Sequence, residues 1–435
     1  MLFDSTSHQV RDVSFRQAVY QGFSPDGGLY IPKTLPQFSH SRLKKMHGLS
    51  FFECLLAVGS KIFQNEMTRT EIQKVFEEAF NFPAPFLSFS DNLHTIELFH
   101  GPTFSFKDFG ARFMATLIKY WRKKEEEIVI LVATSGDTGS AVGQAFCGIE
   151  GVKVYILYPK GLVTSSQEKQ LTTMGQNVTA LEVAGTFEQC QQLLKKACLD
   201  PDLKKGAIVT TANSINVARL FPQALYYFYA YSRLPENDKP VIFSVPCGNF
   251  GHLVSGILAK RMGLPIDHFL GVTNINDEVP LYLKTGIFQP HTAYQTIAVS
   301  MDVGDPSNFP RLLELYDHSR EKMQKEIVGI SFEDKQVKLA IQQVLKKHHY
   351  LLDPHSAFAY LALYNYLNEK RPYRGIFFET AHPAKFIESL KPLVSKTIDV
   401  PGKLKQVLTK PKQAIEIPPT YSVFKNIIYE KTAVL

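Results

Sequence analysis

Two different spacings of hydrophobic residues divide the chain near residue 90. In Ser50–Phe63 and Thr68–Phe82, apolar side chains recur every three or four positions, which is typical of helices with one buried face. Further along, continuous apolar runs alternate with glycine-containing turns and helical segments. The runs Ile128–Thr134, Val152–Pro159 and Pro240–Gly248 are typical of buried parallel strands. The pattern predicts an α/β protein with open, mostly parallel sheets that are covered by helices.

The length of the chain and its proline residues suggest how these elements are grouped. A chain of 435 residues is longer than one compact core normally holds. The segment Phe82–Pro85 contains two prolines and ends the helical pattern before it, because proline cannot continue a helix. We therefore expect an N-terminal α+β domain in residues 1–90, a smaller α/β domain in residues 91–205 and a larger one in residues 206–435.

Composition excludes several classes of function. The net charge is +7, but the 48 basic residues are dispersed, so we expect no nucleic-acid partner. The five cysteines include no C-x-x-C pair and the histidines include no H-x-x-x-H pair, so we expect neither a disulfide framework nor a metal site. Apolar runs are too short to span a membrane, and the N-terminus has polar and charged residues from Asp4 on, without the apolar segment of a signal peptide. A cytoplasmic location is the expectation.

Two glycine-rich turns are candidate binding loops. Thr134–Ser140 and Pro246–His252 each follow a predicted buried strand and precede a predicted helix. Backbone amides at such a helix start favour an anion. Neither turn has the lysine of a nucleotide-binding P-loop or the G-x-G-x-x-G spacing, so a smaller phosphorylated ligand is indicated. Glycine turns also follow strands that bind nothing, so either loop alone leaves both interpretations open.

Lys107 directly follows one aromatic residue, Phe106, and Asp108 separates it from another, Phe109. Apolar surroundings lower the pKa of a lysine, and a neutral amine can form a Schiff base with a carbonyl. Pyridoxal phosphate offers such a carbonyl, together with one phosphate and a ring nitrogen that needs a partner. The alternative is a lysine at a helix start that pairs with Asp108, and spacing alone favours it. Among residues near the C-terminal histidines, Thr380 is the best placed donor to a ring nitrogen.

Five segments appear in the order that is found in the threonine synthase family. They read "HGPTFSFKDFGARFM", "ATSGDTGSA", "NSINVAR", "CGNFGH" and "ETAHPAKF". The earlier segment "FSPDGGLYIP" resembles the N-terminal domain of that family. The resemblance covers nearly the whole chain and is closer to the bacterial and fungal branch than to the plant-like branch.

This resemblance implies a fold-type II pyridoxal-phosphate enzyme with Lys107 as the Schiff-base lysine. It implies that Thr380 bonds the ring nitrogen and that Asp137 lies near the ring hydroxyl. The residues implied at the cofactor phosphate are Gly248, Asn249, Phe250, Gly251 and His252. Those implied on the substrate side are Thr134, Ser135, Thr138, Asn213, Asn216 and Arg219. Arg219 is the candidate partner of the substrate phosphate, because arginine binds phosphate through two parallel hydrogen bonds.

The implied reaction converts O-phospho-L-homoserine and water into L-threonine and phosphate, by β,γ-elimination followed by addition of water. A phospho-lyase or a serine/threonine dehydratase on the same scaffold is the alternative. We expect a small-molecule substrate, no membrane partner, and a monomer or a homodimer. Two departures from the family pattern stand out. Ser7 and His8 stand where many relatives read Thr-Arg-Gly, so any role of that arginine is missing or moved. His252 replaces an asparagine and is expected only to modulate phosphate binding.

Overall fold

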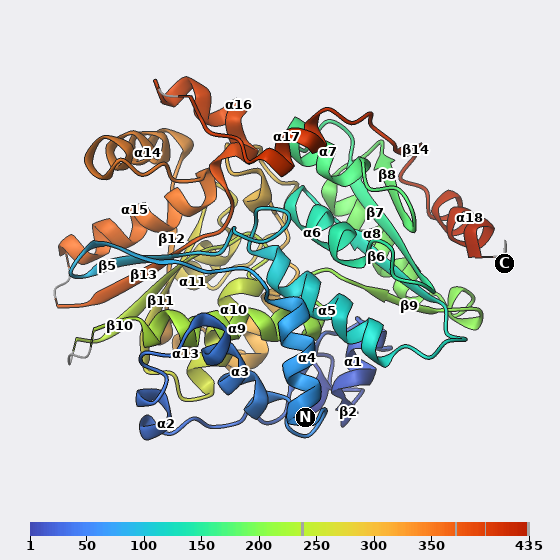
Figure 1. Cartoon of the computed structure of the whole chain (residues 1–435), viewed down its shortest axis with the longest axis horizontal. Coiled ribbons are helices and arrows are strands. Elements are labelled where there is room, and N and C mark those ends of the chain that lie inside the picture. Colours follow the sequence, from blue (N-terminus) through green and yellow to red (C-terminus); the bar gives the residue numbers. More distant parts are fainter. Residues whose placement is uncertain (236–238, 370–371, 396, 433–435) are drawn as a thin grey trace. The chain divides into compact units, whose positions relative to one another are not determined.

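The computed structural model describes residues 1–235, 239–369, 372–395 and 397–432, which form two compact units (Figure 1). Unit 1 contains residues 1–34, 107–219 and the segment from 400 onward, and unit 2 contains residues 35–106 and 220–399. This division differs from the three consecutive domains predicted above. The physical reason is strand pairing, because segments that are far apart in the sequence join the same sheet.

Unit 1 is built on a parallel sheet of five strands in the order β14-β8-β7-β6-β9. Its strands are β6 (Ile128–Ala133), β7 (Val152–Pro159), β8 (Val178–Val183), β9 (Ile208–Thr211) and β14 (Ile415–Ile417). Every residue of β6 is buried, as its continuous apolar sequence predicts. The edge strand β14 comes from the C-terminal segment, which explains why the last part of the chain belongs to this unit.

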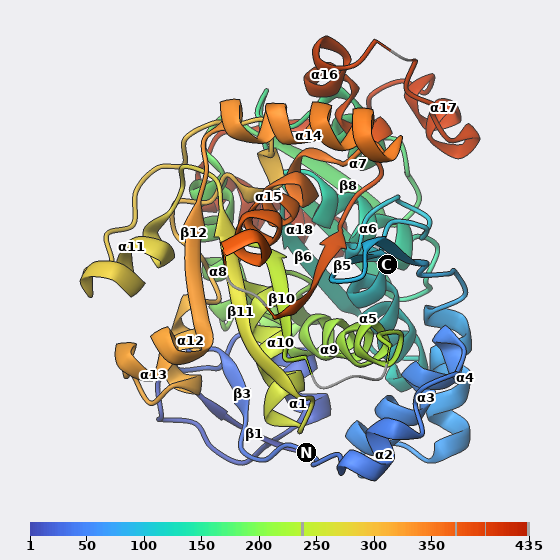
Figure 2. The same cartoon turned by 90° about the vertical axis from the view of Figure 1, so that its left-hand side faces the viewer.

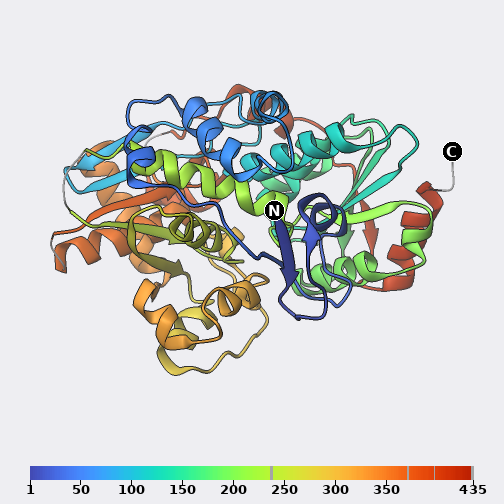
Figure 3. The same cartoon turned by 90° about the horizontal axis from the view of Figure 1, so that it is seen from below.

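Helices cover the unit 1 sheet. They are α5 (Lys107–Trp121), α6 (Asp137–Phe146), α7 (Ser165–Thr172), α8 (Phe187–Leu199), α17 (Gly402–Leu408) and α18 (Tyr421–Thr432), with the short 3₁₀ helix η1 (Leu203–Lys205). The helix α9 (Val217–Ser232) contains the junction between the units at residues 219 and 220. Figure 3 shows α18 in red beside α8 in green. Lys425 of α18 forms a 2.8 Å ion pair with Asp200, directly after α8, and so holds the C-terminal helix to the unit.

A small antiparallel sheet forms the N-terminal part of unit 1 and is dark blue in Figure 3. Its strands are β1 (Leu2–Ser5), β2 (Val13–Ser14) and β3 (Tyr30–Pro32), and α1 (Phe15–Gln21) follows β2. The carbonyl oxygen of Val19 in α1 accepts hydrogen bonds from Thr210 and Asn216, both at 2.8 Å. These bonds attach the N-terminal segment to the end of β9.

Unit 2 is built on a sheet of six strands in the order β12-β11-β10-β13-β5-β4. Its strands are β4 (Phe86–Ser90), β5 (Leu93–Glu97), β10 (Val241–Pro246), β11 (Ile266–Thr273), β12 (Ile327–Ser331) and β13 (Arg374–Glu379). All neighbours are parallel except β4, which runs antiparallel to β5. The proline segment at 82–85 therefore leads into this sheet.

Helices lie on both faces of the unit 2 sheet. They are α2 (His40–Lys44), α3 (Phe51–Ile62), α4 (Arg69–Ala79), α10 (Gly251–Arg261), α11 (Glu278–Thr285), α12 (Phe309–Leu315), α13 (Arg320–Glu326), α14 (Asp334–His348), α15 (Pro354–Glu369) and α16 (Ile387–Leu390). Three 3₁₀ turns complete the unit: η2 (Val299–Met301), η3 (Pro383–Phe386) and η4 (Lys391–Leu393). Figure 1 shows α15 on one face of the sheet and α10 on the other, and Figure 2 shows α14 packed on α15. The fully buried β10 lies between them.

The predicted mixture of sheets and covering helices is confirmed. The helices expected over 50–63 and 68–82 are α3 and α4, and each begins with a capping box in which a serine or threonine and a glutamate bond each other's backbone. Over the described part of the chain, no helix combines the length and the apolar character needed to cross a bilayer.

Candidate functional site

In unit 2, the turn after β10 forms the start of α10. The amide of Cys247 still donates to the sheet, with a 2.7 Å bond to the Val272 carbonyl. A Cβ on Gly248 would lie 2.9 Å from the Ser300 carbonyl oxygen, so only glycine allows this close approach of backbones. Phe250 has a φ of 58°, in the left-handed region, and α10 begins at the next residue. The turn therefore reverses direction sharply at the end of a buried strand.

This turn presents unpaired backbone donors. In the described residues, the amides of Gly248, Asn249, Phe250 and Gly251 have no hydrogen-bond acceptor. The first amides of a helix carry a partial positive charge and have no partner inside the helix. Four consecutive donors at one helix start can surround the oxygens of a single anion.

The side chains of Asn249 and His252 support the turn. The Asn249 side-chain oxygen accepts hydrogen bonds from the Ser307 hydroxyl at 2.7 Å and from its amide at 3.2 Å. The His252 ring is buried and stacks on Phe106, with ring centroids 5.0 Å apart and planes at 25°. It also contacts three further aromatic rings, those of Tyr226, Tyr227 and Phe378. His252 is therefore part of an aromatic cluster at the start of α10.

Thr380 follows the last residue of β13 and is buried. Its amide donates to the Ser356 hydroxyl at 2.9 Å, and its carbonyl accepts from the Phe106 amide at 2.8 Å. Next to it, Ser105 and Ala381 form an isolated antiparallel bridge. The segment that ends in Phe106 is thus held along the end of β13, and Lys107 is the next residue of the chain.

In unit 1, Lys107 is the first residue of α5 and is partly exposed. The residues that follow it, Asp108, Phe109 and Gly110, are buried. A Cβ on Gly110 would lie 2.7 Å from the Arg219 side chain and 2.9 Å from its carbonyl, so glycine lets the two segments pack closely. The helix therefore begins at a partly exposed lysine, and the first turn behind it is closely packed.

The turn Thr134–Ser140 contains hydroxyl groups of two kinds, one that is bonded within the turn and others that are partly exposed. The buried Thr134 hydroxyl accepts bonds from the amides of Gly136 at 2.9 Å and Gly139 at 3.0 Å, so it shapes the turn itself. The hydroxyls of Ser135 and Thr138 are partly exposed, and neither has a hydrogen-bond partner in the described residues. Of the three, Ser135 and Thr138 carry the partly exposed hydroxyls, whereas Thr134 is buried in the turn that it shapes.

Asp137 begins α6 in the same turn and is buried. Its carboxylate accepts a 2.9 Å hydrogen bond from the side-chain amide of Gln167, which is fully buried. Gly136 precedes it with a φ of 145°, and a Cβ there would lie 2.4 Å from the Gln167 side chain. The glycine thus makes room for the partner of the aspartate.

The segment Asn213–Arg219 is held by bonds within unit 1. The Asn213 side chain bonds both backbone groups of Ala133, at 2.9 and 2.7 Å, directly before the Thr134 turn. Asn216 is buried and donates to the carbonyls of Val19 and Thr211. Arg219 is 1% exposed and donates to the Ala212 carbonyl. These bonds give each side chain a role in the fold, and their roles toward a substrate stay predictions.

The chain is similar to known proteins over nearly its whole length. The sequence profile described as pyridoxal-phosphate dependent enzyme matches residues 96–375, and the profile described as threonine synthase N terminus matches residues 2–80. The chain is 38% identical to the threonine synthase of Escherichia coli K12 over 428 residues, covering 98% of this chain and 99% of the relative.

Solved structures of threonine synthases have the same fold as this chain. The crystal structure of the Escherichia coli threonine synthase superposes with a TM-score of 0.94 at 38% identity, covering 99% of this chain and 100% of that one. A pyridoxal-phosphate-bound threonine synthase from Brucella melitensis gives 0.89 at 31% identity, covering 99% of each chain.

The chain belongs to the threonine synthase family. It is accordingly a pyridoxal-phosphate-dependent lyase, as the sequence motifs predicted. The residues present fit that cofactor. The four unpaired amides from Gly248 to Gly251 are suited to its phosphate, and the Thr380 hydroxyl is a neutral group of the kind that bonds a ring nitrogen. Unit 2 carries both of these features, and unit 1 carries the Lys107 amine.

Sequence reasoning missed several side chains that shape these loops. Ser307 bonds Asn249, Gln167 bonds Asp137, and Ser356 bonds Thr380. Each partner lies between 24 and 58 residues away in the chain. A serine two residues beyond a proline at a helix start is the only signal for Ser356, and nothing in the sequence connects it with Thr380.

His8, one of the departures from the family pattern, lies in a turn of unit 1. His8 follows β1 in unit 1, with a φ of 61°, and its amide donates to the Ser5 carbonyl at 2.9 Å.

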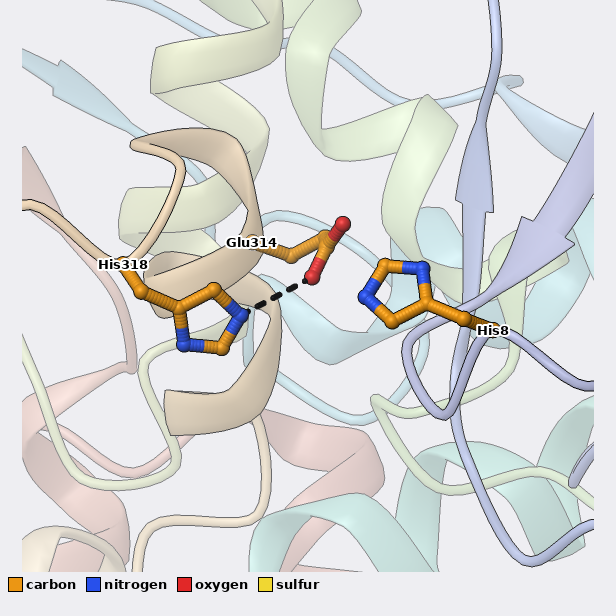
Figure 4. Close-up of side chains that lie close together, drawn as sticks. All are labelled: His8, Glu314 and His318. Atoms are coloured by element: carbon orange, nitrogen blue, oxygen red, sulfur yellow. Dashed lines mark hydrogen bonds and ion pairs between the residues drawn. The ribbon is translucent and has the colours of Figure 1, made fainter.

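In unit 2, Glu314 at the end of α12 lies 3.2 Å from the His318 ring (Figure 4). That pair is four residues apart and His318 is exposed, so it is a surface pair of its own unit.

Proposed function

We propose that this chain converts O-phospho-L-homoserine and water into L-threonine and phosphate. The observation that carries the proposal is the row of unpaired amides from Gly248 to Gly251 at the start of α10. It lies in a chain that matches threonine synthases over nearly its full length. The names of those relatives support the same reaction for this chain.

When bound, pyridoxal phosphate supplies a carbonyl that condenses with amines and a ring that withdraws electrons from the substrate Cα. In the proposal, the Lys107 amine holds that carbonyl until the substrate amine replaces it. The released amine then takes the proton from the substrate Cα. Lys107 is the first residue of α5, and the residues of the helical turn that follow it are buried.

The other predicted residues bind the cofactor or the substrate and orient it. The amides of Gly248–Gly251 hold the cofactor phosphate, and Thr380 donates to the ring nitrogen. Asp137 faces the ring hydroxyl, with its carboxylate oriented by Gln167. Ser135 and Thr138 donate to the substrate, because their hydroxyls are not used within the described residues. Arg219 is proposed for the substrate phosphate.

The reaction balances with one water consumed. The bond between Cγ and the phosphate ester oxygen breaks, and phosphate leaves. Protons are lost from Cα and Cβ and are regained at Cα and Cγ. Water supplies the hydroxyl at Cβ, and its remaining proton goes to the departing phosphate. A dehydratase would release a keto acid and ammonia from its substrate, so the products distinguish the two activities.

We further propose a cytoplasmic enzyme that acts as a monomer or a homodimer on a small-molecule substrate. The five free cysteines support a reducing compartment. Four of them are buried.

The test compares the protein as expressed with Lys107→Ala and with Lys119→Ala, a matched change on the same helix. Each is incubated with phosphohomoserine, and free phosphate, threonine and keto acid are measured. The unchanged protein and Lys119→Ala should release phosphate and threonine in equal amounts, and Lys107→Ala should release neither. Keto acid in place of threonine would contradict the proposal, as would phosphate release by Lys107→Ala.

A further inference from the structure

The imidazole of His355 links two segments of unit 2 through hydrogen bonds of defined direction. The amide of Ser300 donates to Nε2 of His355 at 3.1 Å. Because a backbone amide can only donate, Nε2 must be the unprotonated nitrogen of a neutral ring. The ring proton then lies on Nδ1, which is 2.9 Å from a carboxylate oxygen of Asp353. His355 therefore accepts from Ser300 and donates to Asp353.

Further contacts fix the orientation of the His355 ring. Asp353 is fully buried, and the oxygen that accepts from Nδ1 also accepts from the His355 amide at 2.9 Å. The other oxygen of Asp353 accepts from the Ser356 hydroxyl. The ring of Phe386 packs against the imidazole, with centroids 4.8 Å apart and planes at 61°. His355 is 4% exposed, and these contacts keep its Nε2 directed at Ser300.

Ser300 in turn lies against the turn at the start of α10. It belongs to η2, and a Cβ on Gly248 would lie 2.9 Å from the Ser300 carbonyl oxygen and 3.0 Å from the Met301 Cα. The peptide between Ser300 and Met301 thus packs on the backbone of Gly248. Further along the same segment, the amide and the hydroxyl of Ser307 donate to the side-chain oxygen of Asn249. The segment from η2 to Ser307 therefore contacts two neighbouring residues of the turn.

Other bonds hold this segment at positions next to Ser300. The Ile297 amide donates to the Asp334 carboxylate at 3.1 Å, and the Thr296 hydroxyl donates to Asp302 at 2.6 Å. The bond to His355 acts at Ser300 itself, whose carbonyl is the group that approaches Gly248. The position of the His355 ring is thus transmitted to the turn through one residue.

We propose that His355 is a positioning residue for the cofactor phosphate. By accepting from the Ser300 amide, it holds the Ser300 carbonyl against Gly248 and so keeps the amides of the turn directed at the phosphate. This inference rests on the proposed function, which assigns the amides of Gly248–Gly251 to that phosphate. In this role His355 acts through the backbone of Ser300 and not by contact with the cofactor.

Two amide side chains separate the bonds of His355. In His355→Gln, the side-chain oxygen can reach the position of Nε2 and still accept from Ser300, whereas the donor to Asp353 is lost. In His355→Asn, the shorter side chain ends near the position of Nδ1, so the bond to Asp353 can be kept and the acceptor for Ser300 is lost. Both variants lack the imidazole, so a loss of stability that they share reports only the missing ring.

The experiment measures the affinity of each protein for pyridoxal phosphate by absorbance titration and records the ³¹P chemical shift of the bound cofactor. His355→Gln should agree with the unchanged protein within about threefold in affinity and give the same shift. His355→Asn should bind at least about tenfold more weakly, and its ³¹P signal should move toward that of the free cofactor.

His268→Asn is the matched control for the loss of a buried imidazole. The His268 ring is buried and bonds Asp267 at 2.6 Å. It lies near the start of β11, whereas Val272, which accepts from the amide of Cys247 directly before the turn, lies near the end of that strand. Affinity and ³¹P shift should therefore stay unchanged in this variant.

An unchanged affinity in His355→Asn would overturn the inference. A loss in His355→Gln as large as that in His355→Asn, or larger, would also overturn it, because the effect would then not follow the bond to Ser300. If neither variant folds, Ser300→Pro removes the donor of the same bond and leaves His355 intact. It should give the affinity and the shift expected for His355→Asn, and unchanged values would overturn the inference.

Threonine formation by the unchanged protein is measured in parallel. Its absence contradicts the proposed function, whereas its presence together with equal cofactor affinities in all variants contradicts only the role of His355.

Discussion

The amide of Phe106 donates a 2.8 Å hydrogen bond to the carbonyl oxygen of Thr380. Two further backbone contacts flank it, the bridge between Ser105 and Ala381 and a 3.0 Å bond from the His382 amide to the Phe104 carbonyl. The residues before Lys107 thus form a short antiparallel addition to the chain that follows β13. The backbone that leads to the predicted Schiff-base lysine is fixed against the residue that is predicted at the ring nitrogen.

The ring of His252 stacks on the ring of Phe106. Replacing His252 therefore tests how much this stacking contributes to the stability of unit 2. His252→Asn, which restores the residue common in the family, removes contacts with four aromatic rings. We expect it to lower the free energy of unfolding by about 1–3 kcal/mol, because aromatic pairs and buried area are both lost. His252→Phe keeps the ring and should retain most of the stability. Urea unfolding of the three cofactor-free proteins measures the difference.

Cofactor affinity gives the second readout for His252. If the stacked ring holds Phe106 in place, His252→Asn should weaken pyridoxal-phosphate binding several-fold more than His252→Phe. Equal stability and affinity in both variants would show that the aromatic cluster is not needed, and that the residue acts only on the phosphate as the sequence suggested.

The α/β fold could be predicted because it depends on local patterns. Continuous apolar runs such as Ile128–Thr134 identify buried strands, and the glycine turns mark where helices begin. Domain grouping could not be predicted in the same way. It depends on which strands pair, and β5 joins β13 across some 280 residues of sequence. Neither hydrophobic spacing nor proline position reports such a pairing.

The candidate site was predictable to a similar extent. The turns at Thr134 and Gly248 are continuous motifs, so their position was visible in the sequence. The network of Asp353, Ser356 and Thr380 was not, because a helix start and a strand end are brought together only by the sheet. The different uses of Thr134 and Ser135 were also hidden, since only the turn geometry shows which hydroxyl is already bonded.

Gly248→Ala tests the anion-binding turn. The new Cβ would lie 2.9 Å from the Ser300 carbonyl oxygen and 3.0 Å from the Met301 Cα, and backbone atoms cannot move aside cheaply. We expect a loss of about 1–3 kcal/mol in stability and at least a tenfold loss in pyridoxal-phosphate affinity, because the amides of the turn are displaced. Gly402→Ala is the control. Apart from its chain neighbours and its own helix backbone, no atom of the described residues would lie within 4 Å of its Cβ, and stability should not fall. Cofactor titration followed by absorbance measures the affinity, and unchanged affinity in Gly248→Ala would contradict the assignment.

Thr134→Val and Ser135→Ala should separate a structural hydroxyl from a substrate-binding one. Thr134→Val leaves the amides of Gly136 and Gly139 without their acceptor in a buried turn, so we expect a loss of about 1–3 kcal/mol in stability. Ser135→Ala removes a hydroxyl that has no partner in the described residues, and stability should stay within about 0.5 kcal/mol. Its KM for phosphohomoserine should rise instead. Steady-state kinetics and urea unfolding of both variants check this, and an unchanged KM in Ser135→Ala would remove Ser135 from the substrate site.

Asp302 in unit 2 gives the chain a predictable dependence of stability on pH. Its carboxyl accepts bonds from Asn274 at 2.7 Å and from the Thr296 hydroxyl at 2.6 Å, yet burial raises its pKa to about 6. An aspartate in an unfolded chain has a pKa of about 4. Between these values the folded state binds the proton more strongly, so the contribution of Asp302 to stability must fall as pH rises from about 4 to about 6. A shift of this size corresponds to at most about 3 kcal/mol.

Asp302→Asn removes this titration, and the comparison with the unchanged protein isolates it. The free energy of unfolding of the unchanged protein, relative to Asp302→Asn, should decrease from about pH 4 to about pH 6 and stay constant above. Asp317→Asn serves as a control of opposite sign, because the side chain of Lys322, 2.6 Å away, lowers the pKa of the exposed Asp317. Relative to that variant, the stability of the unchanged protein should rise with pH through the acidic range. Urea unfolding at half-unit pH steps measures both differences, and a constant difference for Asp302→Asn would show that its carboxyl ionises at an ordinary pH in the folded chain.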